Sequence, residues 1–170
     1  MFHMETRKVE LVVAIGKEIK SNEFSSIENK RDVAAAILKC VYGYAVGIDL
    51  TRRDRQQEGK DAGLPWDLGK FFDQSAPIGP ITATNSPFEY LDNKTLSLTV
   101  NGEIKQSVLL KQMIWNVPDI ILELSKSYDL KPGDLIMTGT PKGVGPVTVG
   151  DRLIGSIDGG LVENVDIILT

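Results

Sequence analysis

Short apolar runs separated by polar stretches dominate the chain, and most are too short for helices. Residues 9–16 (VELVVAIG) form a compact run that ends at a glycine, which predicts a strand. Residues 42–50 predict a second strand. Residues 96–107 predict a hairpin, because Asn101 and Gly102 suit the positive φ angles of a type I′ turn. Further short strands are predicted at residues 135–139, 152–157 and 161–169.

Helical patterns are few. Asp32 can cap a helix over residues 33–40, and residues 52–63 also suit a helix. Residues 116–128 predict one amphipathic helix with Asn116 as its cap. Its predicted inward stripe consists of Val117, Ile120, Ile121 and Leu124. Strands dominate without a regular strand–helix alternation, so the pattern predicts a β-rich α+β fold, with residues 1–170 as a single domain.

Composition narrows the class of protein. The 170 residues are 42% hydrophobic and 25% charged, as in ordinary globular chains, and the net charge of −4 argues against nucleic acid as a partner. Cys40 is the only cysteine, which excludes an intramolecular disulfide and suits a reducing compartment. The apolar run at residues 11–15 is too short for a signal peptide, and no run approaches 18 apolar residues. We therefore expect a cytoplasmic protein with no membrane partner.

Asp49 closes the second strand in an unusual setting. Successive residues of that strand point to opposite faces. One face is bulky and apolar, and the other carries almost no side chains and ends at Asp49. Such a face would leave room for a cation or a ligand beside the carboxylate. The alternative is that Asp49 only caps the helix that follows. The bare face consists of Gly43, Ala45, Gly47 and Asp49, and the bulky one of Tyr44, Val46 and Ile48.

Glu10 is a lone carboxylate within the first apolar strand. A buried charge there needs a partner or a metal ion. The alternative is an edge strand on which Glu10 faces water. Two carboxylates from separate strands would suit a hard divalent cation such as Mg²⁺. Since His3 is the only histidine, a zinc site with several histidines is excluded.

Basic residues follow Asp49. On a helix that starts just after it, Arg53, Gln56 and Lys60 share one face. Lys70 lies in an aromatic-rich, loop-like stretch, where it could face an anionic substrate. A lysine in a loop is more often solvated, so both interpretations of Lys70 stay open.

Residues 138–145 (TGTPKGVG) are rich in glycine but lack the GK[ST] ending of a P-loop. They form either a plain turn or a loop whose backbone N–H groups and Thr140 face a carboxylate or enolate oxygen.

Five segments spread over nearly the whole chain carry a resemblance to a known family. They are VELVVAIGK, GYAVGIDLTRRDRQ, GLPWDLGKFFDQSAP, LSLTVNG and KPGDLIMTGTPKGVGPVTVGD. In these segments and their order the chain resembles the fumarylacetoacetate hydrolase family, especially its small single-domain members that act on acylpyruvates. DLTRRDRQ and TGTPKGVGPV are the most specific motifs.

The resemblance implies a fold and an activity. The fold would be a fumarylacetoacetase C-terminal-like β-roll of mixed sheets with few short helices, usually in a homodimer. The activity would be hydrolysis of a C–C bond in a keto acid of the acylpyruvate type, such as fumarylpyruvate, in aromatic catabolism. A Mg²⁺ or Mn²⁺ cofactor would stabilise a pyruvate enolate. Isomerase or oxaloacetate decarboxylase activity is a neighbouring expectation.

The resemblance also implies roles for individual residues. Glu10 and Asp49 would be metal ligands. Lys70 would be catalytic, in contact with the substrate or the attacking water. The other implied substrate-binding residues are Arg53, Gln56 and Thr140.

Two departures from the family pattern bear on activity. With Glu10 as the second glutamate of the family's E-x-E strand, Lys8 occupies the position of the first, where a third metal ligand is expected. In a shifted alignment, Glu5 of His3-x-Glu5 would be the ligand and extra residues would bulge out before Glu10. Strand alternation favours Lys8 in place. The family's preceding segment, with its water-activating His-Glu pair, has no counterpart in this sequence, so we also expect a truncated chain or a relative that only binds keto acids.

Overall fold

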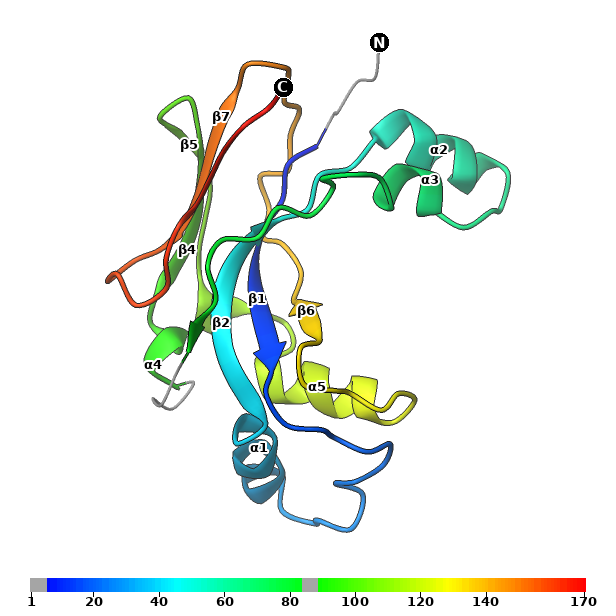
Figure 1. Cartoon of the computed structure of the whole chain (residues 1–170), viewed down its shortest axis with the longest axis vertical. Helices are drawn as coiled ribbons and strands as arrows, with labels where there is room; N and C mark the ends of the chain where they lie inside the picture. Colours follow the sequence, from blue (N-terminus) through cyan, green and yellow to red (C-terminus); the bar gives the residue numbers. More distant parts are fainter. Residues whose placement is uncertain (1–5, 84–88) are drawn as a thin grey trace.

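Two four-stranded sheets form the framework of the molecule (Figure 1). The computed structural model describes residues 6–83 and 89–170. In strand order, the first sheet consists of β3 (Thr82–Ala83), β2 (Val41–Ile48), β1 (Val9–Ile15) and β6 (Leu135–Met137). The second consists of β5 (Glu103–Leu109), β4 (Thr95–Val100), β7 (Arg152–Ile157) and β8 (Val165–Ile168). The predicted β-rich α+β fold is confirmed.

The pairing of the strands differs in one respect from what the resemblance implied. All six pairs of neighbouring named strands are antiparallel, so the described sheets are not mixed. In β4 and β5 the reason is local: a two-residue turn joins them, and such a turn reverses the chain.

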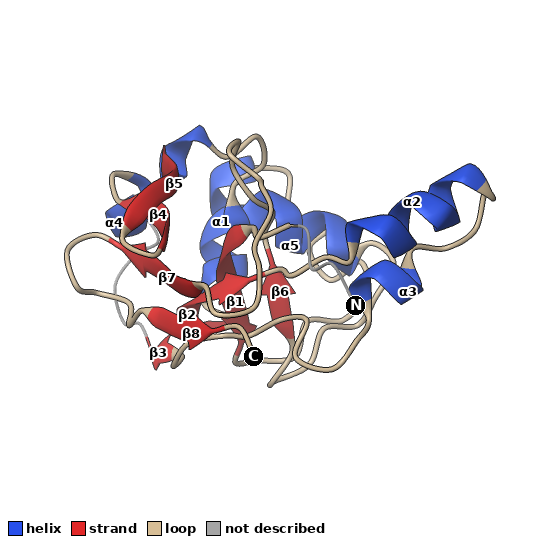
Figure 2. Ribbon diagram, turned by 90° about the horizontal axis from the view of Figure 1, so that it is seen from above, coloured by secondary structure: helices blue, strands red, loops and turns tan. Residues whose placement is uncertain are grey.

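Short helices accompany the sheets. They are α1 (Lys30–Leu38), α2 (Arg53–Asp61), α3 (Asp67–Lys70), α4 (Glu89–Asp92), α5 (Val117–Ser125) and a 3₁₀ turn at Leu110–Gln112. Helices α1 and α5 pack on each other, whereas α2 and α3 form an arm that projects from the strands, as a second view also shows (Figure 2). No helix within the described ranges is long and apolar enough to cross a membrane.

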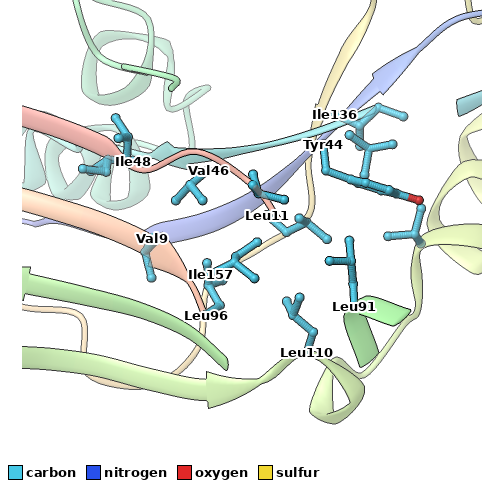
Figure 3. Packing of buried hydrophobic residues seen from close by; sticks show 14 of the residues in the cluster. Val9, Leu11, Tyr44, Val46, Ile48, Leu91, Leu96, Leu110, Ile136 and Ile157 are labelled. Atoms are coloured by element: carbon cyan, nitrogen blue, oxygen red, sulfur yellow. The ribbon is translucent and has the colours of Figure 1, made fainter. Parts of the chain in front are cut away.

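The hydrophobic core lies between the two sheets. On β1, alternate residues such as Val9 and Leu11 face β4 and β7, and Figure 3 shows them beside Val46 of β2 and Ile157 of β7. The sheets approach each other closely at Gly155, where a Cβ atom would lie 2.9 Å from Cγ1 of Val46. A side chain at this position of β7 would therefore force the neighbouring valines or the sheets to shift.

Several local predictions are confirmed. The hairpin turn has φ angles of 51° at Asn101 and 84° at Gly102, and Asn116 caps α5 through a hydrogen bond from the N–H of Asp119. Within the helix Val117 and Ile121 are buried, and Ile120 and Leu124 pack against the core.

Other boundaries were predicted wrongly. Helix α1 begins three residues earlier than expected, and its cap is Asn29, not Asp32. Asn29 accepts a hydrogen bond from the N–H of Arg31, and Asp32 lies inside the first turn. The last strand begins only at Val165, because residues 158–162 form the turn and bend that follow β7.

Candidate metal and substrate site

The pairing of β1 with β2 determines which charged groups meet. The β1–β2 ladder and the isolated bridge between Thr6 and Thr51 share one register, so Lys8 lies opposite Asp49 and Glu10 lies one position further along the same face. The backbone N–H of Asp49 donates to the carbonyl of Lys8 at 2.8 Å.

This register tests the two alignments of the N-terminal segment. No extra residue is inserted between Thr6 and Glu10, so Lys8 occupies its predicted position and the bulged alternative is wrong for these residues. His3 and Glu5, on which that alternative also depended, lie outside the described residues.

Asp49 is held by two lysines. Nζ of Lys8 lies 2.8 Å from its Oδ2 atom, and Nζ of Lys70 donates to the same oxygen. Burial alone would raise the pKa of the Asp49 carboxyl, but the hydrogen bonds and charges of the two lysines hold that pKa below its ordinary value. Asp49 is not the cap of α2, since the cap position is Arg52 and has no side-chain cap bond.

Glu10 lies on a central strand and not at an edge. Only 6% of the residue is exposed, so the alternative in which it faces water is wrong. Its Oε2 atom accepts a hydrogen bond of 2.8 Å from the N–H of Gly139. Burial raises the pKa of Glu10, and the nearby Asp49 carboxylate raises it further; the Gly139 N–H and the two lysines only partly oppose this shift.

Lys70 reaches the site from the projecting arm. It ends α3, and α3 packs tightly on α2 because Gly69 has no side chain: a Cβ there would lie 2.8 Å from the backbone nitrogen of Gln56. The N–H of Arg52 donates to the Gly69 carbonyl at 3.0 Å. Burial lowers the pKa of Lys70, the bond to Asp49 opposes this, and Lys8 lowers it again.

Of the three residues predicted to share one face of α2, only Arg53 and Gln56 interact with each other. The guanidinium of Arg53 donates to Oε1 of Gln56, which is 3% exposed and lies on the side that packs against α3. Lys60 does not join them, because its ammonium lies 4.9 Å above the ring of Trp66. Arg53 and Gln56 thus belong to the same arm as Lys70.

The loop after β6 runs beside Glu10. Thr140 accepts a hydrogen bond of 3.0 Å at its Oγ1 atom from the amide of Gln106. The N–H of Gly139 in this loop donates to a carboxylate oxygen of the protein itself, that of Glu10.

Gln106 is a residue that the sequence analysis missed. It is 2% exposed, its Oε1 accepts from the N–H of Val9 at 3.0 Å, and its amide nitrogen donates to Thr140 and to the Pro141 carbonyl. It therefore ties β1, β5 and the Thr140 loop together. A polar residue in a short strand gives no local signal of such a role.

The small residues of β2 do not leave an open space along that strand. A Cβ at Gly47 would lie 2.7 Å from Cγ2 of Val12 and 3.3 Å from Cε of Met137. The bare face therefore serves close packing, and the expectation of room for a ligand holds at most at its end, beside Asp49.

The carboxylate oxygens of this site supply part of the ligand set that a hard divalent cation needs. Among the described residues, no group of three His, Cys, Asp or Glu side chains could hold a metal ion. Glu10 and Asp49 lie on one face of the sheet, as diagonal neighbours on adjacent segments. The Cα atoms of such diagonal neighbours are typically about 7–8 Å apart. Mg²⁺ is often held by one or two carboxylates together with ligand oxygens and water. Glu10 and Asp49 are the residues that would hold such an ion, and Lys8 stands where a third ligand was expected.

A comparison with known sequences identifies the family. Residues 1–165 match the family model described as "Fumarylacetoacetate (FAA) hydrolase C-terminal". The chain belongs to the fumarylacetoacetate hydrolase family. The resemblance seen in the motifs is thereby confirmed.

Several members of this family are close relatives. A fumarylpyruvate hydrolase of Ralstonia is 41% identical over 158 residues, which cover 93% of this chain and 74% of that protein. An oxaloacetate tautomerase of Escherichia coli is 42% identical over 156 residues, covering 89% and 65%. The crystal structure of a Pseudomonas aeruginosa fumarylpyruvate hydrolase in complex with Mn²⁺ and pyruvate has a TM-score of 0.80 and 38% identity, covering 98% and 66%. The chain thus spans roughly two thirds to three quarters of the length of these relatives.

Proposed function

We propose that this chain hydrolyses a C–C bond in an acylpyruvate, a 2,4-dioxo acid such as fumarylpyruvate, with Mg²⁺ or Mn²⁺ as cofactor. The observation that carries the proposal is that Glu10 and Asp49 share one face of the sheet and that Lys70, from a separate segment, donates to Asp49. The fumarylpyruvate hydrolase relatives, one of them bound to Mn²⁺ and pyruvate, support the substrate class and the cofactor. Such a reaction would belong to aromatic catabolism.

The proposed reaction needs an electrophile, a water molecule and a stabilised leaving group. Water adds to the acyl carbonyl, the bond between that carbon and the adjacent CH₂ breaks, and its electron pair passes to the pyruvate enolate. A proton then returns to the enolate carbon, so the products are pyruvate and a carboxylic acid. A bound Mg²⁺ or Mn²⁺ supplies Lewis-acid stabilisation of the developing negative charge.

The chain's own residues take distinct parts in this proposal. Glu10 and Asp49 hold the cation. Lys70 contacts the substrate or the attacking water, and the lowering of its pKa by burial brings it nearer to a form that can accept a proton. Thr140 can donate its hydroxyl proton to the pyruvoyl end, because its oxygen already accepts from Gln106.

Substrate positioning and assembly complete the proposal. Arg53, oriented by its bond to Gln56, would bind a substrate carboxylate, since a guanidinium matches carboxylate geometry. We also propose that the chain works as a homodimer, as the family resemblance implies.

A second candidate function is tautomerisation of oxaloacetate. The 42% identical Escherichia coli tautomerase favours it. The same site would then move a proton between carbon and oxygen of the keto acid, with Lys70 as the acid–base group; a C–H bond is exchanged for an O–H bond and no C–C bond is broken. Decarboxylation or isomerisation of a related keto acid uses the same enolate.

Product analysis tests these candidates. The purified chain is incubated with fumarylpyruvate, acetylpyruvate or oxaloacetate, with Mg²⁺ or Mn²⁺ or with EDTA. Metal-dependent release of pyruvate from a dioxo acid supports hydrolysis. Loss of enol absorbance from oxaloacetate without release of CO₂ supports tautomerisation, and release of CO₂ supports decarboxylation.

Variants link the activity to the site. Asp49→Asn and Lys70→Met should each reduce kcat/KM by about 100-fold or more, in the range of a lost acid–base or charge-stabilising group. Lys39→Met, an exposed lysine at the end of α1, is the matched control. Turnover by the folded Asp49→Asn variant at the wild-type rate would refute the proposal, and binding of pyruvate without any turnover would identify a keto acid-binding relative.

A further inference from the structure

We propose that Lys8 is a counter-ion within the metal site. Its ammonium pairs with Asp49 while no cation is bound, and it pairs instead with the carboxylate of the keto acid when a cation binds. Cation and keto acid would then bind together and not independently. Lys8 would be a positioning residue for the ligand anion. This inference rests on the proposed function, because it takes Glu10 and Asp49 as the residues that accept the cation.

The first observation is the position of the Lys8 ammonium. It lies 2.8 Å from Oδ2 of Asp49 and 3.1 Å from Oγ1 of Thr51, with only 14% of its side chain exposed. The backbone on both sides is fixed by pairing with β2, so the ammonium can leave Asp49 only by rotation of its own side chain. Lysine has a flexible four-carbon stem that allows this movement.

The second observation is that Asp49 already has cationic partners. Lys8 and Lys70 both donate to Oδ2, and the Thr51 hydroxyl donates to Oδ1 at 3.4 Å, so a divalent cation can reach this carboxylate only beside an ammonium or by displacing one. A divalent cation beside the ammonium of Lys8 or Lys70 would be repelled strongly, because both charges are positive and solvent is largely excluded there. Lys70 comes from the arm and Lys8 from the residue just before β1, so the two lysines can move separately.

The third observation is the charge of the whole cluster. The formal charges of the Glu10 and Asp49 carboxylates and of the Lys8 and Lys70 ammoniums cancel. A divalent cation alone would leave this half-buried site with two uncompensated positive charges. A dianionic ligand such as oxalate, which resembles the pyruvate enolate, would restore neutrality. Lys8, once released from Asp49, would be free to pair with this ligand, because its ammonium lies at the same carboxylate.

The test is Mn²⁺ binding to the whole chain by titration calorimetry, with and without oxalate. In the wild type we expect Mn²⁺ to bind at least about tenfold more tightly when oxalate is saturating, because a charge within about 4–6 Å changes occupancy by a factor of about ten or more. In Lys8→Met, Mn²⁺ alone should bind at least about tenfold more tightly than in the wild type, and the oxalate effect should shrink. Lys8→Glu should bind Mn²⁺ more tightly still. Lys39→Met is the control and should match the wild type.

The outcomes distinguish a failure of this inference from a failure of the proposed function on which it rests. Equal Mn²⁺ affinity in the wild type and in Lys8→Met, or no oxalate effect in the wild type, would overturn the role of Lys8 and leave the metal site standing. Absence of Mn²⁺ binding in the folded wild type and in both Lys8 variants would overturn the proposed metal-dependent function as well. The wild-type comparison needs no variant, so a variant that fails to fold does not prevent the test.

Discussion

Replacement of Gln106 by leucine should destabilise the protein far more than an ordinary change in a short strand. The variant loses the acceptor of the Val9 N–H and the donor to Thr140 and Pro141. Each of these three bonds contributes about 0.5–1.5 kcal/mol net, and a buried N–H left without an acceptor costs about 1–3 kcal/mol. Leucine has a similar volume, so only the polar losses count: about 1–3 kcal/mol for the two donor bonds together and about 1–3 kcal/mol for the stranded Val9 N–H. We therefore expect a total loss of about 2–6 kcal/mol in the free energy of unfolding.

Urea unfolding monitored by circular dichroism measures this loss. Gln112→Leu, an exposed glutamine in the 3₁₀ turn, is the matched control and should change the free energy of unfolding by no more than about 0.5 kcal/mol. If the two variants unfold at the same urea concentration with the same slope, then Gln106 does not join β1 to the Thr140 loop. A second readout is the KM for an acylpyruvate, which should rise because Thr140 loses its anchor.

Two further predictions concern packing and pH. Gly155→Ala should destabilise the protein by about 1–3 kcal/mol, because its Cβ would lie 2.8 Å from Cγ1 of Val165 and 2.9 Å from Cγ1 of Val46; an unchanged urea midpoint would contradict this. For Glu10, burial raises the pKa above the ordinary 4.5, so the carboxyl stabilises the fold below pH 4.5 and that contribution is lost as the pH rises through the folded-state pKa. The stability of Glu10→Gln relative to the wild type should therefore increase over this range, and a difference independent of pH would contradict it.

Much of the framework follows from local pattern. Residues 9–15 and Arg152–Ile157 form strands as predicted, and Asn101-Gly102 forms the predicted turn, because alternation and turn chemistry act over a few neighbouring residues. The same alternation places Lys8 and Glu10 on one face. The sequence alone therefore singled out Glu10 and Asp49 as candidate metal ligands and Lys8 as the departure from the family pattern.

Partnerships across the chain were decided only by the tertiary structure. Lys8 and Asp49 are 41 residues apart, and Val9 and Gln106 are 97 apart. Whether Glu10 lies at an edge or inside a sheet depends on which strands pair beside β1, and no residue near Glu10 carries that information. Local sequence thus determined which side chains share a face. The packing of distant strands determined the partners of those side chains, because burial and ion pairing depend on groups that meet only when the sheets assemble.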